Sequence, residues 1–264
     1  MPHWRIGTTG FTDPHWVGPF YPRDIQSGQH LGFYSRYFNS AEIDTTFHAA
    51  PTVDRVKRWA AQVPPDFRFC VKTPKTVTHG DSIVHVTDDM LSFCDVVRHF
   101  DNLLGAILIQ FPPSLPFTVA PHLEKLLDAL PADLRFAVEF RHDSWNNPRT
   151  AEILRARRCA WVLADYMAKE PWPVPATTDF LYVRWIGIHE QFHVHNAEQF
   201  DVTDRLNWWK QELERLAPDP ATPLYGMFNN DYAGYALGTA NRFRKLLGLP
   251  APAPTAIDKG ELFG

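Results

Sequence analysis

The sequence has few of the features that mark secreted or membrane-spanning proteins. Its 264 residues include only three cysteines, Cys70, Cys94 and Cys159, which are widely spaced in apolar surroundings. Such spacing is typical of neither a disulfide framework nor a CxxC metal site, so we expect three reduced packing residues. No apolar run approaches the roughly 20 residues that a membrane-spanning helix needs. We therefore expect no membrane partner.

An excess of positive charge is also lacking. Lysine and arginine number 26 against 30 aspartates and glutamates, which gives a net charge of -4. This balance disfavours nucleic acid as a general partner, although a local basic cleft stays open as an alternative. The N-terminal segment, residues 1–6, lacks the apolar region of a signal peptide, which predicts a cytoplasmic protein.

Several catalytic signatures are missing. The chain has no GxSxG nucleophile motif, no GxxxxGK[ST] phosphate loop and no GxGxxG after its first strand-like segment. We accordingly predict no organic cofactor. No low-complexity linker divides the chain, so we predict one domain over residues 1–249 and an extended tail, rich in proline and alanine, over residues 250–264.

Short apolar runs alternate with segments of helical periodicity, a pattern typical of repeated βα units on a parallel sheet. Eight runs are predicted as strands: Trp4 to Thr9, Ala41 to Thr46, Phe67 to Thr73, Gly105 to Gln110, Phe136 to Arg141, Ala160 to Asp165, Phe180 to Trp185 and Pro223 to Phe228. The segment Tyr166 to Asp179 holds three prolines, so we expect no regular helix after strand six. The predicted fold class is α/β, a (β/α)8 TIM-like barrel.

Polar residues gather at the ends of these predicted strands. They are Glu42, Asp44, Lys72, Gln110, Glu139, Arg141, Asp165, Arg184, Asn229 and Asn230. Side chains at i and i+2 of a strand share a face, so Glu139 and Arg141 should project together into the barrel mouth. Active sites of such barrels lie at this end. The alternative is a structural network in which acids and bases neutralise one another.

The candidate site divides into three groups by chemistry. We predict Glu139 as general acid/base, with Glu42 and Asp165 as supporting carboxylates. Cations recognise phosphate or carboxylate groups, and amides orient a ligand. The predicted substrate-binding residues are Lys72, Gln110, Arg141, His142, Arg184, Asn229 and Asn230. The predicted partner is therefore a small polar or anionic ligand.

At this level of detail the sequence resembles the DUF72, or YecE-like, family along almost its whole length. The stretches that carry the resemblance are Gly7-Thr8-Thr9-Gly10, Trp16, Phe20-Tyr21-Pro22, Phe33-Tyr34, Glu42-Ile43, Thr46-Phe47, Trp59, Pro64 to Phe69, Val71-Lys72, Thr78-His79, Gln110-Phe111-Pro112-Pro113, Val138 to His142, Ser144-Trp145, Asp165, Tyr182-Val183-Arg184, Phe228-Asn229-Asn230-Asp231, Gly234 and Ala236. The resemblance implies a TIM-like barrel of unassigned function, with some similarity to endonuclease IV and sugar isomerase barrels. His48 and Ile186 depart from the family, which usually has tyrosine and histidine there.

Three functions follow as alternatives. The preferred one is a hydrolase acting on a sugar-containing or anionic small molecule, since paired carboxylates can serve glycoside hydrolysis. The second is a metal-assisted phosphodiesterase resembling endonuclease IV, and the third is a non-catalytic ligand-binding protein. Whether the chain is an enzyme is thus left open.

Metal ligands are not assigned from the sequence, and a divalent metal remains an alternative. Glu42, Glu139 and Asp165 could hold Mg²⁺ or Mn²⁺, because hard cations accept carboxylates alone. His189, His193 and His195 lie close together in the chain. Their spacing suits neither one helix face nor an HExxH motif, so we interpret the segment as a solvated loop.

Overall fold

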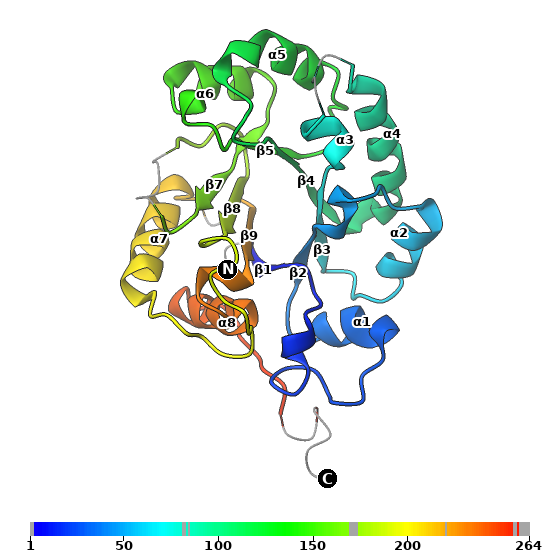
Figure 1. Cartoon of the computed structure of the whole chain (residues 1–264), viewed down its shortest axis with the longest axis vertical. Coiled ribbons are helices and arrows are strands. Elements are labelled where there is room, and N and C mark those ends of the chain that lie inside the picture. Colours follow the sequence, from blue (N-terminus) through cyan, green and yellow to red (C-terminus); the bar gives the residue numbers. More distant parts are fainter. Residues whose placement is uncertain are drawn as a thin grey trace.

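The structure is a computed structural model that describes residues 3–80, 83, 85–168, 174–219, 221–255 and 258. In these residues nine parallel strands form one sheet in the order β6-β5-β4-β3-β2-β1-β9-β8-β7. The strands are β1 Trp4–Thr9, β2 Ser40–Ile43, β3 Arg68–Lys72, β4 Leu104–Gln110, β5 Phe136–Glu139, β6 Ala160–Trp161, β7 Leu163–Asp165, β8 Leu181–Trp185 and β9 Leu224–Phe228. Figure 1 looks into the ring that they form.

One interrupted strand closes the ring. β6 pairs with β5 and β7 pairs with β8, and only Val162 separates β6 from β7. The backbone N–H of Val162 still donates to the carbonyl of Val138 in β5, at 2.9 Å. β6 and β7 together are therefore the predicted sixth strand, and the predicted TIM-like barrel is confirmed.

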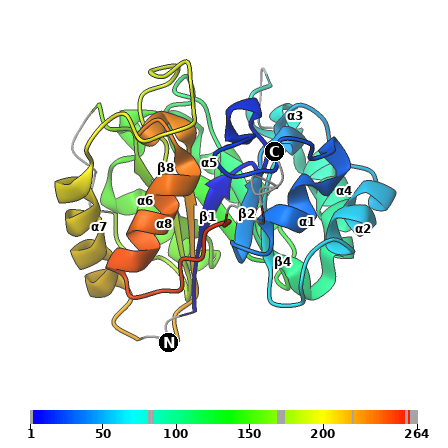
Figure 2. The ribbon, with the colours of Figure 1, turned by 90° about the horizontal axis from the view of Figure 1, so that it is seen from below.

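Helices cover the outside of the barrel (Figures 1 and 2). They are α1 His30–Tyr34, α2 Val53–Ala60, α3 Lys75–Thr78, α4 Thr87–Val97, α5 Ala120–Asp128, α6 Pro148–Ala156, α7 Thr203–Leu216 and α8 Ala236–Leu246. Side-chain caps fix some of the starts: Asn147 accepts from the N–H of Thr150 at the head of α6, where Pro148 occupies the first turn. The four-residue α3 was not predicted, because a single turn has too little periodicity.

The segment after the interrupted strand contains no helix in its described residues, 166–168 and 174–179, as predicted; residues 169–173 lie outside the described part. Much of the predicted tail, at 256, 257 and 259–264, also lies outside it. The division into one domain and a tail stays a prediction. None of the helices described is long and apolar enough to cross a membrane.

Alternation along the strands separates two apolar layers. Inside the barrel a small cluster is built largely from Cys70, Leu108, Tyr182 and small residues such as Ala137 and Ala160. The opposite strand faces pack against the helices in a much larger core. Because i and i+2 share a face, the residues two positions beyond Cys70, Leu108, Ala137 and Tyr182 continue the inner face to the mouth of the barrel. These are Lys72, Gln110, Glu139 and Arg184.

Candidate active site at the barrel mouth

Arg184 joins two buried glutamates from distant strands. Its Nη1 donates to Glu139 Oε2 of β5 at 2.6 Å, and its Nη2 donates to Glu42 Oε1 of β2 at 2.7 Å. Its Nε donates to Glu42 Oε2 at 3.0 Å. All three side chains are almost fully buried. Burial of these charges is tolerable because each carboxylate has a cationic partner.

The remaining carboxylate oxygens also have donors. The Tyr182 hydroxyl donates to Glu42 Oε2 at 2.8 Å. Arg141 Nε donates to Glu139 Oε1 at 3.0 Å, and the Tyr166 hydroxyl donates to the same oxygen. All four oxygens of the two glutamates therefore accept at least one hydrogen bond. We call Glu42, Glu139 and Arg184, with Arg141 and Lys72, the mouth cluster.

The electrostatics keep Glu139 ionised. Burial alone would raise its pKa, but the charges of Arg184 and Arg141 and the bond from Tyr166 lower the pKa to about 2. In the same way the two glutamates hold the pKa of Arg184 above its ordinary value, although burial opposes this. A general acid must carry a proton at the working pH. The predicted role of Glu139 as acid is thus at odds with its surroundings.

Lys72 is the cation of the mouth cluster whose pKa is lowered by its surroundings. Its ammonium lies 4.0 Å from the centroid of the Phe47 ring, and no carboxylate in the described part of the chain lies within ion-pair distance of it. Burial, followed by the charge of Arg184, lowers the pKa of Lys72 to about 8. Burial and the charge of Lys72 also lower the pKa of the neighbouring His79. A lysine with such a pKa can exchange protons near neutral pH.

Asp165 lies outside the mouth cluster. Its carboxylate accepts from Arg205 Nε at 2.9 Å, from Trp209 Nε1 at 2.6 Å and from the Tyr232 hydroxyl at 3.0 Å. Arg205 and Trp209 belong to α7, so Asp165 faces the helix layer and not the barrel interior. The alternation along β7 explains this, because it is Ala164 that packs with the inner cluster. The structure does not bring Asp165 to Glu42 and Glu139.

The predicted amides and His142 also lie in separate places. Gln110 is buried on the inner face and donates to the Phe111 carbonyl at 2.8 Å. The His142 ring accepts from the N–H of Ser144, as the cap of a short 3₁₀ turn. Asn229 and Asn230 line a cavity of about 320 Å³, together with Asp13, Asp44 and the end of β1. The two asparagines therefore belong to a second part of the mouth.

A larger cavity, of about 1110 Å³, lies at the opposite end of the barrel, where strands β3, β4 and β5 begin. Two of its arginines are neutralised locally: Arg98 pairs with Asp133 at 2.8 Å and Arg157 pairs with Asp128 at 2.8 Å. These pairs are solvent-exposed at the carboxylate. Because the buried charged side chains Glu42, Glu139 and Arg184 lie at the other end, we assign the candidate site to the mouth cluster.

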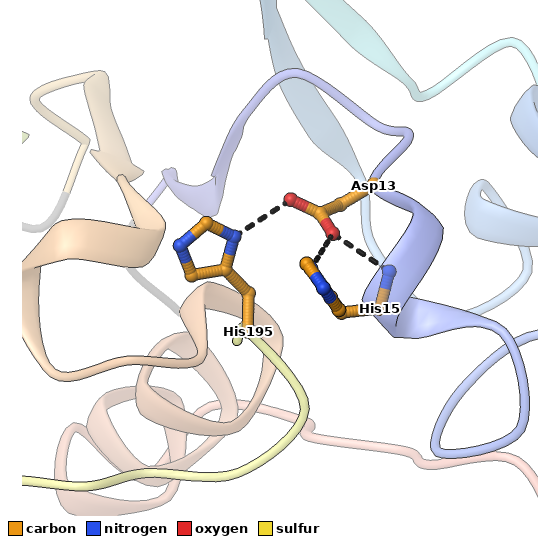
Figure 3. Close-up of side chains that lie close together, drawn as sticks. All are labelled: Asp13, His15 and His195. Atoms are coloured by element: carbon orange, nitrogen blue, oxygen red, sulfur yellow. Dashed lines mark hydrogen bonds and ion pairs between the residues drawn. The ribbon is translucent and has the colours of Figure 1, made fainter. Parts of the chain in front are cut away.

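Of the three loop histidines that the sequence singled out, one joins a group with Asp13 and His15, which the sequence did not single out. His189 and His193 are exposed, whereas His195 reaches across to Asp13, with Nδ1 2.9 Å from Oδ2. Asp13 also contacts His15, as Figure 3 shows. The sequence signal for part of this group was Asp-x-His in the loop after the first strand, but 182 positions separate Asp13 from His195.

Comparison with known sequences now identifies the family. A family model described as "Protein of unknown function DUF72" matches residues 5–259. The chain belongs to the DUF72 family. The UPF0759 protein YecE of Escherichia coli is 35% identical over 130 residues, 49% of this chain and 47% of that protein, so the match spans about half of that relative. The UPF0759 protein YunF of Bacillus subtilis is 24% identical over 96% of this chain and 98% of its own.

Structures of DUF72 proteins share the fold. A crystal structure of a DUF72 family protein from Thermotoga maritima has a TM-score of 0.76 at 29% identity and covers 93% of this chain and 99% of its own. One from Enterococcus faecalis has a TM-score of 0.74 at 20% identity, covering 94% and 99%. The predicted DUF72 membership is confirmed. Neither the family description nor these relatives' names states a reaction.

Proposed function

We propose that this DUF72 protein is a hydrolase of a small anionic molecule, such as a phosphorylated or carboxylated compound, with Lys72 as its proton-transfer residue. The observation that carries the proposal is the half-buried Lys72 ammonium with a pKa of about 8, beside Arg184 and without a carboxylate partner in the described residues. Perturbed lysines of this kind concentrate at functional sites.

The charge balance of the mouth cluster favours an anion. Arg184, Arg141 and Lys72 face the carboxylates of Glu42 and Glu139, so the cluster carries one excess positive charge. The Nε, Nη1 and Nη2 atoms of Arg184 all donate to the two glutamates. The side chain of Arg141, by contrast, is about one-third exposed, and only its Nε donates to Glu139. Its remaining N–H donors can bind a phosphate or carboxylate group.

The role of the glutamates then differs from a glycosidase pair. Both have their oxygens occupied by donors, so they orient Arg184 and Arg141 instead of attacking the substrate. Lys72 takes the acid role: as ammonium it gives a proton to the departing oxygen while water adds to the substrate. The water molecule returns one proton to the Lys72 amine, which restores the ammonium. An acid with a pKa near the working pH is efficient in both directions.

The first test measures Lys72 itself, by competitive acetylation of the protein across pH 6–11 with peptide mass spectrometry. We expect half-maximal reactivity near pH 8 at Lys72, with the exposed Lys75 followed as the control in the same digests. Addition of inorganic phosphate should protect Lys72 and leave Lys75 unchanged.

The second test measures turnover of a panel of p-nitrophenyl phosphates, carboxylate esters and glycosides. Lys72→Met should abolish the hydrolysis that the wild type shows, while Lys75→Met should retain it. Ordinary Lys72 reactivity, without protection by phosphate, would overturn the site. Phosphate protection with no hydrolysis across the panel would favour the non-catalytic binding function instead.

A further inference from the structure

A second constellation at the mouth has ligand chemistry of its own. Asp13 and His15 lie in the segment after β1, and His195 lies in the segment between β8 and α7 (Figure 3). Asp13 Oδ1 lies 3.1 Å from His15 Nδ1, and Asp13 Oδ2 lies 2.9 Å from His195 Nδ1. The two histidine rings meet edge to face, with centroids 5.4 Å apart. In the described residues these three side chains place one ligand atom each within 4.8 Å of one another.

His195 has two hydrogen-bond acceptors but, as a neutral ring, only one N–H to donate. Its Nε2 faces the Phe192 carbonyl at 3.0 Å, and its Nδ1 faces the Asp13 carboxylate at 2.9 Å, so both ring nitrogens point at acceptors. A neutral imidazole has a single N–H and can serve only one of them. A second proton or a metal ion must therefore lie between His195 and Asp13.

We propose that Asp13, His15 and His195 bind one divalent transition-metal ion, of which Zn²⁺ is the representative. Two imidazole nitrogens and a carboxylate oxygen are ligands that zinc accepts, and three protein ligands are the number found in open zinc sites. Ligand atoms at zinc-bond lengths in a tetrahedron are about 3.3 Å apart. The Asp13–His15 and Asp13–His195 contacts, at 3.1 and 2.9 Å, are slightly shorter than this separation, and all three ligand atoms lie within 4.8 Å of one another. Small side-chain rotations therefore suffice to bring the three ligand atoms to the separations of a zinc site.

The surroundings fit a metal ligand set. The bond from His195 Nε2–H to the Phe192 carbonyl fixes the tautomer whose Nδ1 lone pair points at the site. Asn230 Nδ2 donates to Asp13 Oδ2 at 2.9 Å, and Asn230 in turn accepts from Trp16 Nε1 at 3.2 Å. Histidine and carboxylate ligands of metals are commonly oriented by such outer partners.

The location leaves a coordination position for a small ligand. Asp13 and Asn230 both line the cavity of about 320 Å³ at the mouth. A three-ligand ion there can bind water or an oxygen of a bound molecule. The inference is independent of the proposed function, because none of its three ligands belongs to the mouth cluster. Metal binding can fail while Lys72 chemistry stands, and the reverse also holds.

The test is isothermal titration of the EDTA-treated full chain with zinc chloride, supported by the visible spectrum of the Co²⁺ form. We expect one equivalent bound by the wild type. His15→Ala, His195→Ala and Asp13→Asn should each weaken zinc binding by at least about 100-fold, because loss of an outer partner of a metal ligand already costs about 10–100-fold. Asp13→Asn serves as the second type of variant, because asparagine can still cap the turn that Asp13 now caps.

The matched control is His193→Ala, which removes an exposed histidine two positions from His195 in the same segment. It should leave zinc affinity and stoichiometry unchanged. Loss of binding in this control equal to that in His195→Ala would mean adventitious binding by loop histidines and would overturn the site. The site would also be overturned if the wild-type protein bound no zinc and the NMR signals of His195 showed protons on both ring nitrogens.

Discussion

Replacing Lys72 by methionine should stabilise the protein at neutral pH while removing its proposed function. The lowered pKa of Lys72 means that folding moves its ammonium into a place that disfavours the charge. Methionine has a similar length and no charge, so Lys72→Met removes this penalty and retains contact with Phe47. Replacing a functional group that its surroundings disfavour often raises the stability of a protein and lowers its activity.

The magnitude follows from the pKa. A fall from 10.5 to about 8 corresponds to about 3 kcal/mol of unfolding free energy. The lost attraction between the ammonium and the Phe47 ring, about 1 kcal/mol, reduces the gain. We therefore expect Lys72→Met to raise the free energy of unfolding at pH 7 by about 2 kcal/mol.

The lowered pKa of Lys72 also determines how the stability gain from Lys72→Met changes with pH. The lysine penalty is fully present below the folded pKa of about 8 and disappears as the pH rises through the unfolded value of 10.5. The gain from Lys72→Met should accordingly shrink between pH 8 and pH 10.5.

Urea denaturation of both proteins at each pH measures this difference, with Lys75→Met as an exposed control that should change little. A Lys72→Met protein that is less stable than the wild type at pH 7, or equally stable at every pH, would refute the electrostatic reasoning.

Two further substitutions probe the buried charges. Arg184→Met leaves Glu42 and Glu139 without their shared cation and should cost about 3–5 kcal/mol of unfolding free energy in urea denaturation, whereas Arg149→Met breaks only exposed pairs and should cost under about 1 kcal/mol. A cost for Arg184→Met no larger than for Arg149→Met would contradict the buried network. Asp165→Asn should destabilise the protein by about 2–3 kcal/mol but leave phosphate protection of Lys72 intact, because its carboxylate faces α7; loss of that protection in a folded variant would return Asp165 to the site.

The fold could be predicted because strand and helix periods are local properties of the chain. Each predicted strand matches the observed sheet within a few residues, with the sixth covering both β6 and β7, since short apolar runs flanked by longer periodic segments leave few other arrangements. The interruption at Val162 could not be predicted. It depends on how the sixth strand shifts its hydrogen bonds from β5 to β8, which is a long-range property of the closed sheet.

The site was predicted in part, for the same physical reason. The two-residue period predicted Glu139 together with Arg141, and in the structure Arg141 Nε donates to Glu139 Oε1 at 3.0 Å. The same period, applied to Ala160, Val162 and Ala164, assigns Asp165 to the outer face, because these smaller residues fit the crowded interior. Asp13 and His195 could not be joined from sequence, since no local rule relates positions so far apart in the chain.

The double ion pair of Arg184 also bears on how the chain acquires its structure during synthesis. Glu42 and Glu139 leave the ribosome first, and Arg184 follows 142 and 45 residues later. A partial barrel that ended just after β5 would hold Glu42 in its interior without its ion-pair partner, and Glu139 with Arg141 alone. Such intermediates are electrostatically disfavoured, so the first five strands should remain loosely assembled until β8 arrives, and barrel closure should be a single late and cooperative event.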